Sequence, residues 1–256
     1  MAKILARKST LPTARAIREY LLEKTGIKYF ITTDAGDVKD ILLRVGNSDI
    51  SPAKSDSNLN AANVITYCSN KLLFSQKFAD IIPAPGYTLL GRHRPQEFPV
   101  VVRETLSSYG GKGIHMVENQ EQMDAIVNPK FYWTPFVKTS NEFRVHVVGG
   151  IPVKVMKKLP MDLDVEEAAM PIRNVENGYH FQNVEKFLGF KKMMDVTQKV
   201  VDVLGKRSWF ALDIAFSPKH DNYFVFEANS SPSLAENADT LALYMTYIMK
   251  ELNLGK

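Results

Sequence analysis

The fold is decided by one stretch near the C-terminal end, Leu212–Asn229, which reads LDIAFSPKHDNYFVFEAN. Apolar residues alternate with other residues over Leu212–Phe216 and again over Tyr223–Asn229, which is the period-two pattern of a strand with one buried face. Residues 217–222 between these two segments are rich in types that favour turns. The sequence therefore predicts a β-hairpin that closes symmetrically about His220.

Three side chains with oxygen donors share one face of this hairpin. The symmetrical register places Asp213 opposite Glu227, and Asn229 joins them because residues two apart in a strand point the same way. Mg²⁺ prefers oxygen ligands and usually shares them with substrate phosphates. A solvated sheet face is the other interpretation of such an acidic pair. The polar loop Asn229–Pro232 directly after the strand favours a metal site instead, for one or two Mg²⁺ ions with Mn²⁺ as the alternative. The opposite, core-facing side of the hairpin then carries Leu212, Ile214, Phe216, Phe224 and Phe226.

The composition is that of a globular protein with room for a large core. The 256 residues are 45% hydrophobic and 23% charged, which excludes a disordered chain and fits one large domain or two to three lobes. The formal charge of +4 suits anionic small ligands as well as nucleic acid, so it does not choose between them. Cys68 is alone, which indicates a reducing compartment. No apolar run reaches membrane-spanning length, and a cytoplasmic protein without a membrane partner is expected.

Helix and strand alternate in the first part of the chain. A helix is predicted through Arg15–Leu22 and ends at Gly26. Strands are predicted at Tyr29–Thr32 and Asp40–Val45, followed by a polar loop over residues 46–63. This alternation indicates a small α/β lobe.

A glycine-rich loop follows the predicted strand Phe98–Arg103. The loop Thr105–Gly113 (TLSSYGGKG) is made of small residues and glycines, whose backbone N–H groups can approach phosphate oxygens, and Lys112 adds positive charge. It is neither a Walker loop nor a dinucleotide fingerprint, because the extended segment Ile114–Val117 follows it rather than a helix. A plain hairpin turn is an equally simple explanation of this loop.

A second hairpin is predicted around Gly149-Gly150, which is a strong signal for a two-residue turn. Such a turn pairs Glu142 with Lys157 and places Arg144 and His146 on the same face. Cross-strand ion pairs contribute only about 0.2–1 kcal/mol each. A charged face that lines an anion pocket is therefore as good an explanation as stability.

In this order the motifs resemble those of the ATP-grasp enzymes. They are Asn70-Lys71 before IPAP, PVVVR with its glycine loop, an apolar strand, EFR with a Gly-Gly hairpin, and Asp213 followed by EANSSP. The resemblance covers about residues 60–256, and its nearest subgroup contains the ligase that adds glutamate to a ribosomal protein. It implies an α/β (α+β) fold in which two α+β lobes clasp a nucleotide behind a small Rossmann-like α/β lobe. The implied boundaries are residues 1–66, 67–130 and 131–256.

The resemblance also implies roles for single positions. Arg103 stands where the family more often has lysine, and Thr134 where it often has Glu or Gln. The Pro135 carbonyl would accept from the adenine amino group and the Val137 N–H would donate to the ring. Glu142 would reach the ribose, in competition with its pairing to lysine. The implied ATP-binding residues are Lys71, Arg103, Ser107, Ser108, Gly110, Gly111, Lys112, Gly113, Pro135, Phe136, Val137, Glu142, and Lys157 or Lys158. The residues implied to be catalytic are Arg144, Arg173 and Asn174, of which Arg173 and Asn174 would grip the carboxylate substrate.

The activity that the resemblance implies is ATP-dependent ligation of a carboxylate to an amine. ATP phosphorylates a small-molecule or peptide carboxylate to an acylphosphate, and an amine acceptor then displaces phosphate to form an amide. Ala211 and Ser233 depart from the pattern of D-alanine–D-alanine ligases and argue against that substrate. The alternatives are an ATP-grasp kinase for a small molecule and a non-catalytic nucleotide- or nucleic-acid-binding protein. The oligomeric state stays open, a dimer included.

Overall fold

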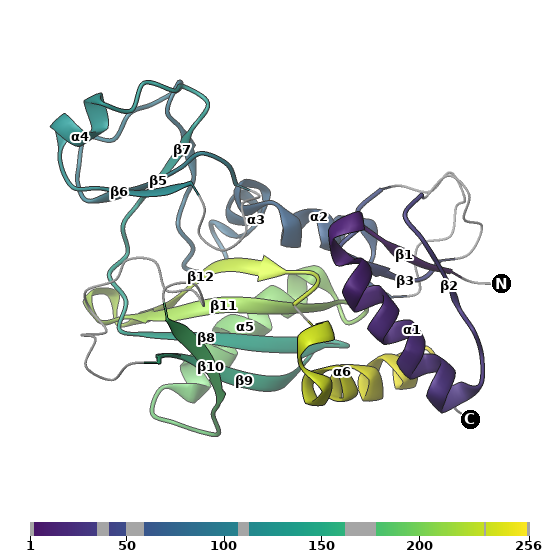
Figure 1. Cartoon of the computed structure of the whole chain (residues 1–256). Helices are drawn as coiled ribbons and strands as arrows, with labels where there is room; N and C mark the ends of the chain where they lie inside the picture. The colour runs from purple at the N-terminus through teal and green to yellow at the C-terminus, as the bar shows by residue number, and fades with distance from the viewer. Residues whose placement is uncertain are drawn as a thin grey trace.

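The computed structural model describes residues 3–34, 41–49, 59–106, 113–161, 178–232 and 234–254. Within these ranges the strands form three sheets, each with its own layer of helices or loops (Figure 1). The mixed α/β fold expected from the sequence is confirmed. The domain boundaries at residues 66/67 and 130/131 stay a prediction.

The N-terminal lobe is a parallel sheet of order β2-β1-β3 covered by one helix. Ile17 and Leu21 of that helix are fully buried against the strands. The helix ends where Gly26 takes a φ of 69°, and the Gly26 N–H bonds to the Leu22 carbonyl at 2.9 Å. Its elements are β1 (Lys3–Ala6), α1 (Leu11–Thr25), β2 (Phe30–Thr32) and β3 (Ile41–Val45).

The central part is an antiparallel sheet of order β4-β7-β5-β6 with a small apolar core of its own. Two helices connect it to the first lobe and pack beside the last strand of the third sheet, through buried residues such as Phe74 and Phe78. Its elements are α2 (Ala62–Ser69), α3 (Lys71–Phe78), β4 (Thr88–Leu89), β5 (Val100–Arg103), β6 (Ile114–Val117), α4 (Gln120–Asp124) and β7 (Tyr132–Pro135).

The C-terminal part is an antiparallel sheet of order β10-β9-β8-β11-β12. The helix α5 covers one face, where Met193 and Val200 pack on Val145 and Leu212. The helix α6 crosses one end of the other face and joins the sheet to the N-terminal lobe (Figure 1). Its elements are β8 (Asn141–Val148), β9 (Ile151–Pro160), β10 (Tyr179–Asn183), α5 (Phe190–Leu204), β11 (Trp209–Ser217), β12 (Asn222–Asn229) and α6 (Ala238–Glu251).

The predicted β11–β12 hairpin is confirmed, with a bulge that the sequence pattern does not show. Ser217 pairs with Asn222 around a 3₁₀ turn, and Asp213 lies opposite Glu227 as expected. Ile214 pairs with Val225, so Phe226 is an extra residue between the two pairs. The extra residue reverses the faces, and the prediction that Phe224 and Phe226 face the core is wrong. The fully or nearly buried residues of β12 are Tyr223, Val225 and Ala228.

A second bulge corrects the hairpin around Gly149-Gly150. The register shifts between His146 and Val147, so that Glu142 lies opposite Lys158. The predicted pairing of Glu142 with Lys157 is therefore wrong, and Lys157 lies opposite Phe143, whose side chain is in the core.

Among the described residues, no helix is both long and apolar enough to cross a membrane.

Candidate active site

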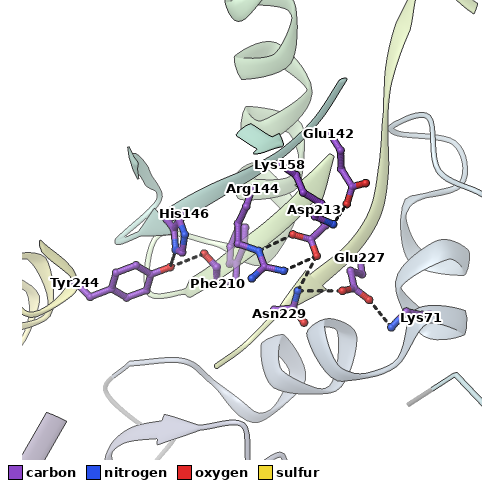
Figure 2. A network of polar contacts seen from close by, with 10 residues as sticks. All are labelled: Lys71, Glu142, Arg144, His146, Lys158, Phe210, Asp213, Glu227, Asn229 and Tyr244. Atoms are coloured by element: carbon purple, nitrogen blue, oxygen red, sulfur yellow. Dashed lines mark hydrogen bonds and ion pairs between the residues drawn. The ribbon is translucent and has the colours of Figure 1, made fainter. Parts of the chain in front are cut away.

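The centre of the site is a row of charged residues across three strands. Arg144 on β8 pairs in register with Asp213 on β11, and Asp213 pairs with Glu227 on β12. Arg144 donates to both oxygens of Asp213, from Nε at 2.7 Å and from Nη2 at 2.8 Å (Figure 2). This two-pronged geometry is the strongest form of an arginine–carboxylate contact.

Arg144 also sets the charge of Asp213, which is only 7% exposed. Burial opposes ionisation of this carboxyl, but the charge and hydrogen bonds of Arg144 outweigh burial and hold the pKa of Asp213 below its ordinary value. Asp213 is therefore an anion at neutral pH.

Lys71 reaches the same row from a helix. Asn70 caps α3 by accepting from the N–H groups of Leu72 and Leu73 at 3.0 and 3.1 Å, which starts the helix at Lys71. The Lys71 ammonium forms an ion pair with Glu227 (Figure 2). Lys71 thus contacts one of the two carboxylates of the row, and this contact supports its predicted place in the site.

Asn229 lies beside both carboxylates. Its Nδ2 is 3.4 Å from Asp213 Oδ2 and 3.3 Å from Glu227 Oε1. Rotation of the amide by half a turn would present its oxygen instead, because the two ends have nearly the same shape. Two facing carboxylates and one amide oxygen are a donor set that fits Mg²⁺. No group of three His, Cys, Asp or Glu side chains suited to a metal occurs in the described ranges, so the donors do not resemble a zinc site.

A third ion pair lies one row further along the same face. Glu142 pairs with the ammonium of Lys158, which is 8% exposed. The ring of Phe181 on β10 lies 4.5 Å from the guanidinium carbon of Arg144 and 5.4 Å from Lys158 Nζ. Phe181 therefore fixes both cations by cation–π contact. Sequence reasoning missed Phe181, because a lone phenylalanine in a short strand has no distinctive pattern.

Two buried polar atoms on the central sheet have no partner within the part of the chain that the structure describes. They are Arg103 Nε on β5 and Thr134 Oγ1 on β7. Buried polar groups are nearly always hydrogen-bonded, so a water molecule or a bound ligand is the expected partner of these two atoms. Arg103 lies against Tyr87, whose pKa is raised by burial, and Tyr87 is near Lys71 and Glu227. Tyr87 is thus a site residue that the sequence did not reveal.

The connection between the two sheets leaves the backbone N–H groups of Val137 and Lys138 without a hydrogen bond among the described residues. Phe136 N–H, in contrast, donates to the Pro99 carbonyl at 3.1 Å. The free Val137 donor fits the expected contact with a nucleotide base. The orphaned Arg103 and Thr134 atoms and this donor are all consistent with ATP.

Several predicted residues fall elsewhere. Gly113 is described and has a φ of 67°, with a carbonyl that accepts from Glu104 N–H at 2.9 Å. Lys157 points to the face opposite Glu142 and Arg144. The remaining predicted residues lie outside the described ranges: Ser107, Ser108, Gly110, Gly111, Lys112, Arg173 and Asn174.

His146 occupies the next row toward α6 and is neutral. Tyr244 OH donates to the Phe210 carbonyl at 3.2 Å, so its oxygen accepts from His146 Nδ1–H at 2.8 Å (Figure 2). Burial, with Arg144 and Lys154 nearby, lowers the pKa of His146 to about 3.

Protein-family models and curated protein sequences give no match to the chain. Solved structures do match. The D-alanine–D-alanine ligase from Bacillus anthracis complexed with ATP has a TM-score of 0.67 and 11% identity, covering 98% of this chain and 96% of that one. A RimK domain ATP-grasp protein from Sphaerobacter thermophilus has a TM-score of 0.61 and 14% identity, covering 97% and 100%. The ATP-grasp ligase PsnB, complexed with a phosphomimetic variant of minimal precursor, Mg and ADP, has a TM-score of 0.63 and 9% identity, covering 98% and 99%.

These matches extend over nearly the whole of each chain, through all three sheets. The protein therefore has the ATP-grasp fold, that of the superfamily its motifs resemble.

Proposed function

We propose that the protein is an ATP-dependent carboxylate–amine ligase that forms an amide bond through an acylphosphate. The observation that carries this proposal is the row Arg144–Asp213–Glu227, in which two facing carboxylates are each held by a cation on one sheet face. ATP and Mg are named in the structures of the ligases that share this fold.

In this proposal Asp213, Glu227 and Asn229 hold one or two Mg²⁺ ions. The metal supplies charge neutralisation for the phosphates of ATP. The two cations that now pair with Asp213 and Glu227 would then be available to phosphate oxygens: Lys71 from α3 and Arg144 from the sheet. Phosphoryl transfer needs little more than such positioning and charge stabilisation.

The nucleotide base is assigned to the segment after β7. The Pro135 carbonyl and the Val137 N–H contact adenine, Phe136 lies between them, and Glu142 reaches the ribose. Arg103 contacts the phosphates. Its orphaned Nε supports this assignment, because a phosphate oxygen would satisfy it. Lys158 replaces Lys157 in the proposal, since Lys158 is the residue that shares the face with Glu142 and Arg144.

Two further segments complete the proposal, and all of their residues except Gly113 lie outside the described ranges. Ser107–Gly113 acts as a lid over the β- and γ-phosphates, and its closure keeps water from the acylphosphate. Arg173 and Asn174 grip the carboxylate substrate. The acceptor amine belongs to an amino acid, a peptide terminus or a modified nucleic-acid base.

The test is release of ADP and phosphate by the protein with Mg²⁺ and ATP, screened against amino acids and short peptides, with mass spectrometry for the amide. The variant Glu227→Gln should abolish turnover, whereas Glu121→Gln, an exposed residue on α4, should behave as the wild type. A stable phosphorylated product without phosphate release would identify a kinase instead. Full turnover by Glu227→Gln would contradict the metal assignment, and ATP binding without ADP release under any condition would contradict an enzyme.

A further inference from the structure

Lys154 lies on the same sheet face as Arg144 and Lys158, but its partner is a hydroxyl group and not a carboxylate. It lies on β9 opposite His146, and its Nζ donates to Thr240 Oγ1 at 2.7 Å. Thr240 belongs to the first turn of α6. The other cations of this face named above each pair with a carboxylate, whereas Lys154 makes no ion pair among the described residues.

The surroundings of Lys154 are short of negative charge. Burial lowers its pKa, and the attraction of Asp239, which lies beyond ion-pair distance, only partly opposes this. The residue directly across, His146, is neutral and provides no counter-charge. Arg144 stands one row further along β8, with its charge already shared with Asp213. An anion placed at Lys154 would therefore be stabilised.

Thr240 adds a second donor at the same point. Its oxygen accepts from Lys154, and its own hydroxyl hydrogen has no acceptor among the described residues. A carboxylate can accept from an ammonium and a hydroxyl at once, which satisfies both groups.

Lys154 lies away from the place proposed for the reacting phosphates. It lies two strands from Asp213 and one row further along the sheet. Strand spacing and rise place the two Cα atoms roughly 12 Å apart. The Lys154 side chain extends toward α6, away from the acidic row. A group bound there belongs to the substrate and not to the nucleotide.

We propose that Lys154 and Thr240 bind a second, unreacted carboxylate of a substrate, so that the enzyme prefers amino acids or peptides with a free carboxylate over their amides. The inference rests on the proposed ligase function. It names the substrate class of that site, and neither residue has a role in holding ATP or Mg²⁺.

The first experiment compares amine acceptors, each amino acid or dipeptide beside its carboxamide, with one carboxylate substrate held constant, in the ADP-release assay. The wild type should show a KM for the free acid about ten- to hundredfold below that for the amide, since a charged hydrogen bond is made only by the acid. Lys154→Gln should raise the KM of the acid toward that of the amide and leave the amide unchanged. Lys154→Arg should retain most of the preference. The control Lys199→Gln changes an exposed lysine of α5 and should alter nothing.

The second experiment does not depend on turnover. Reductive ¹³C-methylation gives each lysine its own NMR signal, and Lys154→Gln identifies the signal of Lys154. Titration with acetate should shift this signal saturably, while the signal of Lys199 should drift only in proportion to concentration. A proportional drift of both signals, or equal use of acid and amide by the wild type, would overturn the proposal. Saturable acetate binding without any amino-acid-stimulated ADP release would refute the ligase function and leave the anion site standing.

Discussion

Replacing Asp213 by asparagine removes one partner of a buried ion pair and leaves the other in place. From the sequence alone, where Asp213 faces a pocket, this change is expected to leave the fold intact. The structure changes that expectation, because the side chains of Arg144 and Asp213 are only 21% and 10% exposed and share two hydrogen bonds. The guanidinium of Arg144 would stay buried without an anion.

The expected cost follows from that geometry. Breaking a buried pair by removing one partner destabilises a protein by roughly 3–5 kcal/mol, much of it the penalty of the remaining charge. Asp213→Asn and Arg144→Met should each cost an amount of this order. The double variant should cost about 2–3 kcal/mol less than the sum of the two, because neither charge is then left alone.

The assay is urea unfolding at pH 7.5 without nucleotide or metal. A matched control exists at the tip of the same hairpin, where Asp221 pairs with Lys192 and the side chains are 84% and 43% exposed. Asp221→Asn should cost no more than about 1 kcal/mol. The double variant should still unfold in one cooperative transition and yet lack Mg-dependent ATP turnover, which separates folding from metal binding. Additive costs at Arg144 and Asp213, or a cost for Asp213→Asn as small as that for Asp221→Asn, would refute the reasoning.

Three further outcomes are expected. A non-hydrolysable ATP analogue with Mg²⁺ should protect residues 105–113 from proteolysis, because small and glycine residues gain contacts when phosphates arrive; identical cleavage with and without the analogue would count against a lid. Arg173→Lys should leave ATP affinity by calorimetry nearly unchanged and raise the KM of the carboxylate substrate by about ten- to hundredfold, since lysine cannot form two parallel hydrogen bonds; a collapse of ATP affinity instead would make Arg173 a phosphate ligand. The pKa of His146 is about 3 in the folded protein and ordinarily about 6.5. As the pH drops below about 6.5, the histidine is protonated in the unfolded state but not in the folded state. The free energy of unfolding therefore falls with pH in this range. Between pH 7.5 and 5.0 this loss should be about 2 kcal/mol in urea unfolding and absent in His146→Gln, and an equal pH dependence in both proteins would contradict it.

The elements that could be predicted from the sequence are those whose signals are local. The alternation in Leu212–Phe216 and Tyr223–Asn229 and the turn residues between them are enough to define a hairpin. The Gly149-Gly150 turn is equally local, and both glycines have the positive φ that such a turn requires. These local signals are sufficient to predict both hairpins, but not the exact pairing of residues within them.

The bulges could not be predicted, because they add a residue without a local signal. The opposition of Asp213 and Glu227 was correct only because two effects cancel. The turn closes between Ser217 and Asn222, one residue tighter than a hairpin centred on His220, and the extra Phe226 restores the register. At the other hairpin nothing cancels, and the partner of Glu142 moves from Lys157 to Lys158.

Other site residues were missed because tertiary contacts alone select them. Tyr87 precedes a two-residue strand, and Phe181 lies in β10 at the edge of the sheet. Neither has a periodic neighbourhood or a motif. Each matters only through the cations it meets, Arg103 for Tyr87 and Arg144 with Lys158 for Phe181.

The ion pairing within the site is the feature that is hardest to predict from the sequence. From the sequence, Asp213 and Glu227 are expected to be free metal ligands. Lys71 is expected to be a free phosphate ligand and Arg144 a free catalytic residue. In the structure these four residues are paired with one another. A metal ion that bound alone would therefore have to displace Lys71 and Arg144 from the two carboxylates. A nucleotide that bound alone would have to displace Asp213 and Glu227 from the two cations. Under the proposed function, Asp213 and Glu227 would exchange their cations for the metal, and Lys71 and Arg144 would exchange the carboxylates for phosphate oxygens when metal and nucleotide bind together. No charge is then left buried without a partner, so we expect Mg²⁺ and ATP to bind cooperatively.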